Sequence, residues 1–536
     1  MLRQSKSRST LSLICLACLL ATTACAQNGP ATLNSSPWFS DGAETVEAAT
    51  QRQINNTPGA AKNVILFIGD GMGISTVTAA RILAGQQQGL AGEEYQLSFE
   101  KFPWSGLSKT YNTDAQVGDS AGTATAFMTG VKSRSGVINV SGEPARGSCT
   151  EFLETENAAL VSALEMAELA GKATGVVSTA RITHATPATA YANSPSRNWE
   201  SDANMPQEAK DAGCTDIASQ LIDVKNRLES KVNAGMPIAA IDGIDVAFGG
   251  GRNNFFAEDP TSLAGFAEAP GEGRRQDGRN LISEWQAGGG RYIMDQAGFE
   301  ALDTSDTSNV LGLFQDSHMR YEANRREDAG GEPSLTEMTV KAIELLQQDE
   351  DGFFLQVEGG RIDHAHHANN GFNALNETVE FARAVAAAIE QVNLDETLVI
   401  VTADHSHVFT MAGYPERGNP ILGIAGNDRD GLPYTTVGYM NGSGFDDNGN
   451  NTNADTRSGP PAVGRHDLTE VDTTAPGYHQ ETLVATNGET HAGEDVGIYA
   501  IGPGAHLVSG TIEQNVIFHV MNYAGDLENQ ALQALK

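Results

Sequence analysis

Short apolar runs alternate with helical patterns over most of this chain. Four runs have the length and the closing polar residues of buried strands: 63–73 (NVILFIGDGMG), 173–181 (ATGVVSTAR), 352–360 (GFFLQVEGG) and 397–405 (TLVIVTADH). Helical patterns precede the last three of them, at 157–171, 334–348 and 376–392. Apolar strands that alternate with helices are typical of a parallel sheet covered on both faces. The pattern therefore predicts an α/β fold with a large, mostly parallel central sheet.

Two regions interrupt this rhythm. Residues 251–280 are rich in loop-forming residues, and residues 413–480 are rich in Gly, Asn, Asp and Pro, with GFDDNGNNTNADTRSGPP at their centre. A long stretch without periodicity is usually an inserted subdomain or a functional loop. We therefore divide the chain into a polar N-terminal lead-in at 27–60 and a main domain at 61–530 that contains both insertions.

The first 26 residues (1–26) have the composition of an export signal. Three basic residues precede the apolar run LSLICLACLLA, and Ala24, Cys25 and Ala26 fit a cleavage site. A lipoprotein signal is the alternative, because TTAC at 22–25 weakly resembles the bacterial motif in which the cysteine becomes the lipidated terminus. Both interpretations predict an exported protein, periplasmic or secreted. No later apolar run reaches about 18 residues, so no membrane span is expected.

Cysteine usage fits export. Three of the five cysteines lie in the signal, which leaves Cys149 and Cys214 in the mature chain. Two cysteines in an exported protein favour one disulfide, and two buried free thiols are the alternative.

The chain is strongly acidic. Its 536 residues carry a formal net charge of −34, and 40 % hydrophobic residues with a mean hydropathy of −0.29 indicate a folded, soluble body. The charge argues against a nucleic-acid partner, because it would repel the phosphate backbone. It also repels small anions at long range, so a phosphate site must reverse the field locally.

Candidate chemistry gathers where the predicted strands end. Asp70 follows the first run, Glu358 closes the third, and Asp404 with His405 ends the fourth. One such ending is ordinary turn chemistry, since Asp and Gly favour turns. In an open parallel sheet, however, ligands bind beyond the carboxyl ends of the strands, so three endings of this kind favour one shared site. Asp404 and His405 can both face it only if the strand has already ended.

The segment GGRIDHAHHANNG (359–371) places one aspartate and three histidines within five positions, in a chain with only 12 histidines. On a helix, Asp363 and His367 lie four apart on one face and could hold one ion, and this pair of ligand types suits zinc. The oxygen ligands Asp70 and Glu358 suit magnesium. A solvated helix face is the alternative interpretation.

A candidate nucleophile lies in QVGDSAGTATAFMTG (116–130). Asp119 and Ser120 precede small residues that suit a tightly packed helix, whose N-terminus directs free N–H groups at an anion. The alternative is that one of them only caps this helix. A neighbouring zinc site would favour the nucleophile, since coordination to a metal activates a serine.

These residues lie in motifs that resemble those of alkaline phosphatases. FIGDGMG, DSAGTATA, THATPATAYANSPSRNW, VEGGRIDHAHH, VTADHSHVF and ETHAGEDVGIYAIGPGAHLVSG occur in family order over roughly residues 62–525. The chain is most similar to the animal-type branch, because THATP and RIDHAHH contain histidine where the best-known bacterial form has Asp and Lys. The resemblance implies an alkaline-phosphatase-like fold and hydrolysis of small phosphate monoesters through a phosphoserine.

The resemblance also implies two zinc ions, one magnesium ion and a role for each site residue. The implied ligands are Asp363, His367 and His491 for the first zinc, Asp70, Asp404, His405 and Ser120 for the second, and Asp70, Thr186 and Glu358 for magnesium. In the implied reaction Ser120 is the nucleophile, Arg197 binds phosphate and Asp119 holds Arg197. His184 and His364 would lie beside the ligands, and His366 would be only their neighbour.

Two departures put the calcium site of the animal-type enzymes in doubt. Gln315 stands where their pattern has Glu, and Glu332 stands where it has Asp. The region 413–480 takes the place of the crown insertion that caps the dimer in that branch, which implies a homodimer. The Asn- and Gly-rich centre of this region does not match the crown well.

Two other functions fit parts of the pattern. A related hydrolase, such as a phosphodiesterase, a phosphoglycerate mutase or a sulfatase, would share the metal site. A sulfatase also needs Pro and Arg after its nucleophile, whereas Ser120 is followed by Ala121, Gly122 and Thr123. A protein that only captures phosphate or metal would tolerate the loss of a ligand or the nucleophile, and none is missing. Release of phosphate from an aryl phosphate discriminates among the three.

Overall fold

The computed structural model describes residues 44–45, 51–232, 238, 241–257 and 273–536. The predicted export signal and its alternative lipidation site, Cys25, lie outside these residues. Residues 51–60, the last part of the predicted lead-in, form no helix or strand. Over the residues that are described, no helix has both the length and the apolar character needed to cross a membrane.

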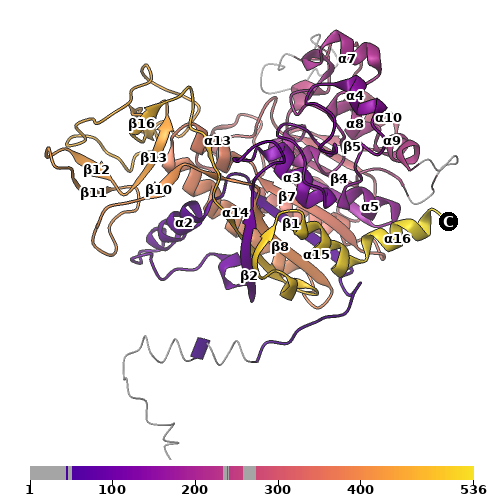
Figure 1. Cartoon of the computed structure of the whole chain (residues 1–536), viewed down its shortest axis with the longest axis horizontal. Coiled ribbons are helices and arrows are strands. Elements are labelled where there is room, and N and C mark those ends of the chain that lie inside the picture. Colours follow the sequence, from indigo (N-terminus) through magenta and orange to yellow (C-terminus); the bar gives the residue numbers. More distant parts are fainter. Residues whose placement is uncertain (1–43, 46–50, 233–237, 239–240, 258–272) are drawn as a thin grey trace, which may run out of the picture. The chain divides into compact units, whose positions relative to one another are not determined.

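The apolar runs form the centre of a ten-stranded sheet (Figure 1), with the order β19-β2-β18-β8-β1-β7-β3-β4-β6-β5. Neighbouring strands are parallel except for the two pairs that contain β18. The prediction of a mostly parallel sheet is therefore confirmed. The strands are β1 (Asn63–Gly69), β2 (Trp104–Lys109), β3 (Ala173–Arg181), β4 (Val246–Gly250), β5 (Arg291–Ile293), β6 (Val310–Leu313), β7 (Phe353–Gly359), β8 (Thr397–Ala403), β18 (Val496–Ile501) and β19 (Gly510–Glu513).

Helices cover both faces of this sheet (Figure 1). Side chains alternate along a strand, so β1 sends Ile65 and Phe67 into one core and Leu66 and Ile68 into the other. The first core includes α2, α12 and α14, and the second includes α3, α5, α8 and α15. The helices are α2 (Ile74–Gln87), α3 (Ser120–Thr129), α4 (Cys149–Glu154), α5 (Ala163–Leu169), α6 (Ala185–Ala188), α7 (Gln207–Ala212), α8 (Ile217–Ile222), α9 (Val224–Lys231), α10 (Leu281–Ala287), α11 (Gln296–Glu300), α12 (Leu335–Leu346), α13 (Arg361–His367), α14 (Gly371–Gln391), α15 (Val516–Gly525) and α16 (Leu527–Ala534).

The helix predicted at 157–171 is shorter than expected, because α5 begins at Ala163. Ser162 caps it: the Ser162 hydroxyl accepts from the Glu165 N–H at 3.0 Å, and the Glu165 carboxylate accepts from the Ser162 N–H at 2.9 Å. This reciprocal capping box stabilises a helix start at 163 rather than 157. The helix predicted at 376–392 begins earlier, at Gly371, where the Asn370 side chain accepts from the Asn373 N–H.

The region 413–480 forms small β-structures beside the main sheet (Figure 1). Its strand β13 (Val437–Gly442) lies between β10 (Phe409–Met411) and β16 (Thr482–Ala485) in a three-stranded sheet. The other short strands are β9 (Ser406–His407), β11 (Ile424–Asn427), β12 (Pro433–Thr435), β14 (Asp446–Asp447), β15 (Tyr478–His479) and β17 (His491–Ala492). In the loop-rich region 251–280, the described residues contain one 3₁₀ turn, Arg252–Asn254.

Cys149 and Cys214 form the predicted disulfide. Cys149 begins α4, and Cys214 follows α7, so the bond joins two short helices that already pack against each other. Trp199 and Met205 pack with Cys149 in a small hydrophobic cluster beneath them. The interpretation as two free thiols is therefore wrong for this structure.

Candidate active site

Sheet register brings the predicted carboxylates together. Strand β1 lies between β7 and β8, and Gly69 pairs with the last residue of each. Asp70, directly after β1, therefore lies beside Asp404, directly after β8, and near Glu358 of β7. All three side chains are completely buried. The carboxyl edge of the sheet thus gathers three acidic groups in one place.

Strand β8 ends at Ala403, so Asp404 and His405 are not forced to opposite faces. His405 Nε2 lies 3.4 Å from Asp404 Oδ2 and 3.4 Å from Asp70 Oδ1. Ser120 Oγ lies 3.1 Å from the same nitrogen and 3.4 Å from Asp70 Oδ1. The four residues expected to surround the second zinc therefore lie together.

Ser120 is the first residue of α3, and Asp119 is its N-cap. Asp119 Oδ1 accepts from the N–H groups of Gly122 (3.2 Å) and Gly136 (2.8 Å), while Oδ2 accepts from Arg197 Nη1 at 3.1 Å. Asp119 therefore caps this helix and also contacts Arg197. The cap fixes the helix start that presents Ser120, and the second oxygen fixes Arg197.

The residues expected to hold the first zinc also converge. Helix α13 places Asp363 and His367 on one face, with His367 Nε2 3.3 Å from Asp363 Oδ1. His491 comes from β17 and brings its Nε2 to 3.4 Å from Asp363 Oδ1 and 3.2 Å from His367 Nε2. Three nitrogen and oxygen atoms of the right types therefore surround one point, as zinc requires.

His407 is a fourth member of this group that sequence reasoning missed. Its Nε2 lies 2.7 Å from Asp363 Oδ1, and its Nδ1 lies 2.5 Å from Glu489 Oε2. Burial alone would lower the pKa of His407, but Glu489 and Asp363 together raise it to about 10. Each ring nitrogen thus faces a carboxylate, so His407 holds Asp363 in place rather than offering a lone pair. Gly71 permits this approach, since its φ is +68° and a Cβ there would lie 2.3 Å from His407 Nε2.

A third group joins Asp70, Glu358 and His184. Thr186 lies two residues after His184 in the same turn, and its hydroxyl is buried. Within the described chain, four buried oxygens of the site have no hydrogen bond of acceptable geometry: Asp70 Oδ2, Thr186 Oγ1, Glu358 Oε1 and Asp404 Oδ2. Buried oxygens without partners are costly, and a cation would satisfy them. The residues present therefore fit the implied metal ions.

The pKa values of the carboxyl groups in the site also indicate a place for cations. Burial, and then repulsion from neighbouring carboxylates, raises the pKa of Asp70 well above its usual value, and burial raises that of Glu358 to about 8. Asp363 behaves in the opposite way: burial would raise its pKa, but His367 and His407 hold it well below the usual range. Several carboxylates at this spacing need cations to stay ionised together.

Three histidines lie together with Arg197. His184 Nε2 lies 3.1 Å from Arg197 Nη2, and the His184 ring packs against the His364 ring with centroids 5.4 Å apart. Sequence reasoning missed His318, whose ring lies 4.1 Å from that of His364 and 5.3 Å from that of His184. Burial and then Arg197 lower the pKa of His184 well below its usual value, so this histidine is neutral.

His366 lies outside the three groups, as expected. It is completely buried, and its ring nitrogens lie 3.0 Å from Thr76 Oγ1 and 2.8 Å from Tyr439 Oη. It therefore joins α13 to α2 and β13.

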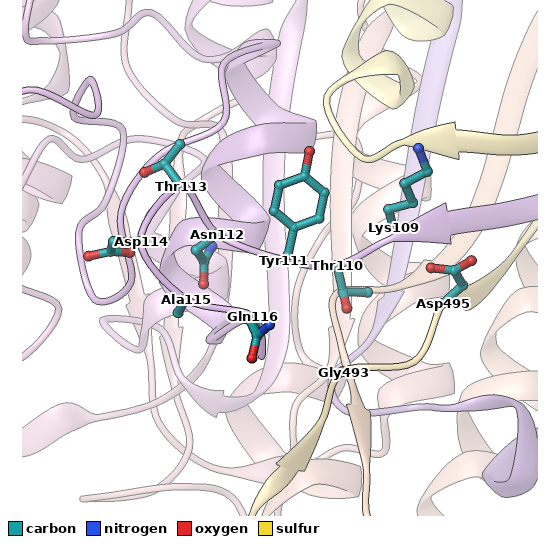
Figure 2. A pocket seen from close by; sticks show the side chains of 10 residues that line it. All are labelled: Lys109, Thr110, Tyr111, Asn112, Thr113, Asp114, Ala115, Gln116, Gly493 and Asp495. Atoms are coloured by element: carbon teal, nitrogen blue, oxygen red, sulfur yellow. The ribbon is translucent and has the colours of Figure 1, made fainter.

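A cavity of about 630 Å³ borders the loop that leads to Ser120 (Figure 2). The side chains from Lys109 to Gln116 line it along the loop after β2, together with Gly493 and Asp495. The same loop continues to Gly118, whose carbonyl oxygen lies 2.9 Å from His491 Nδ1. The cavity therefore lies along the preceding part of this loop, and neither Asp119 nor Ser120 lines it.

Known proteins are similar to this chain in sequence. Human tissue-nonspecific alkaline phosphatase is 43 % identical over 496 residues, covering 91 % of this chain and 88 % of that protein. The alkaline phosphatase of Gadus morhua is 41 % identical over 494 residues, covering 91 % of this chain and 96 % of its own.

Solved structures with the same fold include the alkaline phosphatases of the Antarctic bacterium TAB5 and of Thermus thermophilus. The TAB5 enzyme has a TM-score of 0.55 at 24 % identity and covers 89 % of this chain and 99 % of that one. The Thermus enzyme has a TM-score of 0.59 at 23 % identity, with 91 % and 98 % covered. Residues 61–527 match the alkaline phosphatase family as a whole. Since that match spans nearly all of the main domain, and relatives at 41–43 % identity extend over 91 % of the chain, the protein belongs to the alkaline phosphatase family.

Proposed function

We propose that Ser120 of this alkaline phosphatase attacks phosphate monoesters and forms a phosphoserine, which water then hydrolyses to release inorganic phosphate. The observation that carries the proposal is the position of Ser120 Oγ, at a helix N-terminus and 3.1 Å from His405 Nε2 within a buried carboxylate cluster. Release of phosphate from an aryl phosphate by the purified protein tests it. Faster release from an aryl phosphate diester would favour the phosphodiesterase alternative.

The proposed cofactors are two zinc ions and one magnesium ion. Magnesium is bound in the M3 site of a variant of the TAB5 enzyme, a structure with a TM-score of 0.56 at 24 % identity. The proposed ligands are Asp363, His367 and His491 for one zinc, Asp70, Asp404, His405 and Ser120 for the other, and Asp70, Thr186 and Glu358 for magnesium. When bound, these cations would stabilise the charge on the serine oxygen, the leaving oxygen and the phosphoryl group.

The chain's own residues supply the rest of the chemistry. The N-terminus of α3 directs N–H groups and positive potential toward a phosphoryl group on Ser120. Arg197 carries a fork of donors that suits two phosphoryl oxygens, and Asp119 holds that fork at 3.1 Å. As the bond from Ser120 Oγ to phosphorus forms, the bond from phosphorus to the ester oxygen breaks; Ser120 loses its hydroxyl proton to solvent, and the departing oxygen takes up one proton to leave as the alcohol. Water then attacks phosphorus and loses a proton, and the Ser120 oxygen leaves and regains one, which releases inorganic phosphate.

We do not include calcium in the proposal. Gln315 Nε2 donates to Asp328 Oδ2, and Arg320 Nε lies 3.2 Å from the same oxygen. Glu332 accepts from the Arg320 N–H at 2.8 Å, and burial raises its pKa to about 8. An amide donor and a guanidinium already occupy Asp328 Oδ2, so this oxygen is not free to bind calcium.

His184 and His364 set how tightly product phosphate is held, which is our first testable prediction. The double variant His184→Asp/His364→Lys places a carboxylate near the proposed magnesium and a positive charge near the phosphate. We expect the inhibition constant for inorganic phosphate and kcat both to fall by about 3- to 10-fold, because product release is then slower. We also expect the wild type, but not the double variant, to need added magnesium for full activity.

Steady-state kinetics with phosphate as inhibitor decide this prediction. His519→Asn is the control, since His519 is an exposed histidine of α15 and belongs to none of the ligand groups. Inhibition by phosphate and a kcat that both stay at wild-type values in the double variant would show that the two histidines do not control release.

We further propose that the protein is a homodimer whose interface includes the outer face of the three-stranded sheet. Met440 (57 % exposed) and Leu483 (77 % exposed) lie side by side there, because Tyr439 pairs with Thr482. An apolar patch of this kind is typical of an interface between subunits.

Charge on this face should separate the subunits. We expect Met440→Glu/Leu483→Glu to sediment as a monomer, since burying two carboxylates at an interface is costly, while the wild type sediments at twice the chain mass. Leu532→Glu, an exposed leucine of α16 (51 %), is the control and should leave the mass unchanged. A double variant that remains dimeric would place the interface elsewhere.

The proposed location is outside the cytoplasm, in the periplasm or the medium. The disulfide between Cys149 and Cys214 supports export, since such bonds persist in oxidising compartments. Mass spectrometry of the mature N-terminus separates cleavage after Ala26 from lipidation of Cys25.

A further inference from the structure

The Asn- and Gly-rich centre of the 413–480 insertion lies against the helix that carries Asp363 and His367. Ala454 is only 1 % exposed and packs in one cluster with Ala365 of α13, Ala374 of α14 and Tyr321. A solvated loop would leave this alanine exposed. The segment 453–457 is therefore a packed element, which we call the brace.

Hydrogen bonds within the insertion hold the brace in shape. The Asn453 side chain accepts from the Asp455 N–H at 3.0 Å. Arg457 Nη2 donates to the carbonyl oxygens of Gly444 and Phe445, at 3.1 and 3.0 Å. These contacts fix the backbone on either side of Asp455. The insertion itself therefore orients the Asp455 carboxylate.

Asp455 joins the brace to the start of α13. Its Oδ2 accepts from Arg361 Nη2 at 2.7 Å, and its Oδ1 accepts from Tyr321 Oη at 2.8 Å. The Arg361 guanidinium also lies over the Tyr321 ring, with Cζ 3.8 Å from the centroid. Among the described residues, Asp455 is the only carboxylate in a salt bridge with Arg361, whose side chain is only 6 % exposed. A buried guanidinium thus relies on one carboxylate supplied by the insertion.

Arg361 connects Asp455 to the active site through a series of contacts. Its Nη1 lies 3.1 Å from His364 Nδ1, and His364 packs against His184, which lies 3.1 Å from Arg197. The other end of α13 also meets the insertion, because His479 Nδ1 lies 2.6 Å from the carbonyl oxygen of Ala368. The insertion therefore contacts both ends of the helix that carries Asp363 and His367.

We propose that Asp455 is a positioning residue: through Arg361 it fixes α13 and His364, and so sets metal retention and phosphate binding. The inference rests on the proposed function, because it takes Asp363 and His367 as metal ligands. It also gives the inserted segment a role in the reaction. Groups that orient metal ligands typically change metal affinity or activity by about 10- to 100-fold when they are removed.

Asp455→Ala tests the proposal in the full-length, metal-loaded enzyme. We expect zinc transfer to an excess of chelator to become about 10-fold faster, and the inhibition constant for inorganic phosphate to rise by a similar factor. The Tm should also fall, because Arg361, whose side chain is only 6 % exposed, loses its carboxylate partner. Zinc transfer is therefore measured well below the Tm of both proteins, where each is folded. A purely structural role would lower the Tm and leave zinc transfer from the folded enzyme unchanged.

Three further variants sharpen the result. Asp455→Glu keeps the charge and should recover most of the zinc retention, while Asp447→Asn, an exposed aspartate of the same insertion, should match the wild type. In an Arg361→Met background, Asp455→Ala should have no added effect on zinc transfer, because the contact acts through Arg361.

The outcomes separate this proposal from the proposed function. Wild-type zinc transfer and phosphate inhibition in Asp455→Ala would overturn the positioning role, provided that the parent enzyme hydrolyses an aryl phosphate. A parent enzyme that binds zinc without hydrolysing the ester would contradict the proposed function instead, whatever the variants do.

Discussion

Replacing Ser120 by alanine should remove nearly all turnover while leaving the metal content unchanged. Ser120 Oγ is the hydroxyl that lies 3.1 Å from His405 Nε2 and 3.4 Å from Asp70 Oδ1, and its removal takes away the proposed nucleophile. We expect kcat for an aryl phosphate to fall by roughly a thousand-fold or more. The proposed ligands besides Ser120 remain in the variant, so zinc and magnesium measured by elemental analysis should stay near wild-type values.

Two measurements accompany this variant. Wild-type enzyme quenched at acid pH after exposure to labelled phosphate should carry one covalent phosphoryl group on Ser120, and Ser120→Ala should carry none. Ser509→Ala is the control and should behave as wild type, because Ser509 is exposed and lies just before β19. Substantial turnover by Ser120→Ala would mean that another group or a water molecule attacks phosphorus directly.

Removing the metal ions should abolish activity, and zinc and magnesium together should restore it. Within the site, as the structure describes it, Asp70, Thr186, Glu358 and Asp404 each have a buried oxygen without a hydrogen bond, and without cations the acidic cluster repels both itself and a phosphate ester. We expect the chelator-treated protein to lose more than about 99 % of its activity. Zinc alone should restore only part of it, because Glu358 and Thr186 offer the oxygen ligands that magnesium prefers.

The pH dependence of metal loss follows from the raised pKa values of the same carboxyls. Before metal binds, burial holds the pKa of Glu358 at about 8, so this group carries a proton at pH 6 and loses it at pH 9. Protons therefore compete with metal more strongly at low pH, and binding releases them. Retention of metal against a fixed chelator concentration should fall from pH 9 to pH 6. Retention that is equal at both values, or better at pH 6, would contradict the assignment of Glu358 as a ligand.

The parts of the site that sequence predicted are those that a strand end or a helix turn fixes locally. Asp70 and Asp404 follow apolar runs that are buried on both faces, and Asp363 and His367 are one helical turn apart. Asp119 and Ser120 precede a run of small residues, and the structure has the helix start there. These local patterns carry enough information to place a side chain at the carboxyl edge of a sheet.

The missed residues depend on contacts between distant segments. His407 meets Asp363 across 44 positions and Glu489 across 82, so no local pattern reveals that it holds a ligand. A weak signal existed, since His407 is two residues after His405, but such spacing is common in strands. His318 lies in a loop without periodicity, and only the fold brings its ring to 4.1 Å from His364.

The helix predicted at 157–171 began too early, although the sequence contained a local signal for its true start. The early start predicted for α5 ignored Ser162 and Glu165, whose spacing is that of a capping box.

The three histidines of α13 have the same residue type but different partners: His367 faces Asp363, His364 faces Arg361, and His366 faces Thr76. Residue type and helical spacing could not separate the last two.

The order of strands in the sheet also determines how late in synthesis the folded core can form. Strand β1 is made early in synthesis, yet its only sheet neighbours are β7 and β8, with Asn63 bonded to Phe353 and Thr397 across 290 and 334 positions. Contacts so far apart in sequence form slowly, and a growing chain cannot complete its core until most of it exists. This delay fits the export that we propose, because the chain can pass through a membrane channel before its core is complete. A fragment that ends before residue 353 would contain Asp70 and Ser120 but would lack β7, which pairs with β1 beside them. We expect such a fragment to have no phosphatase activity.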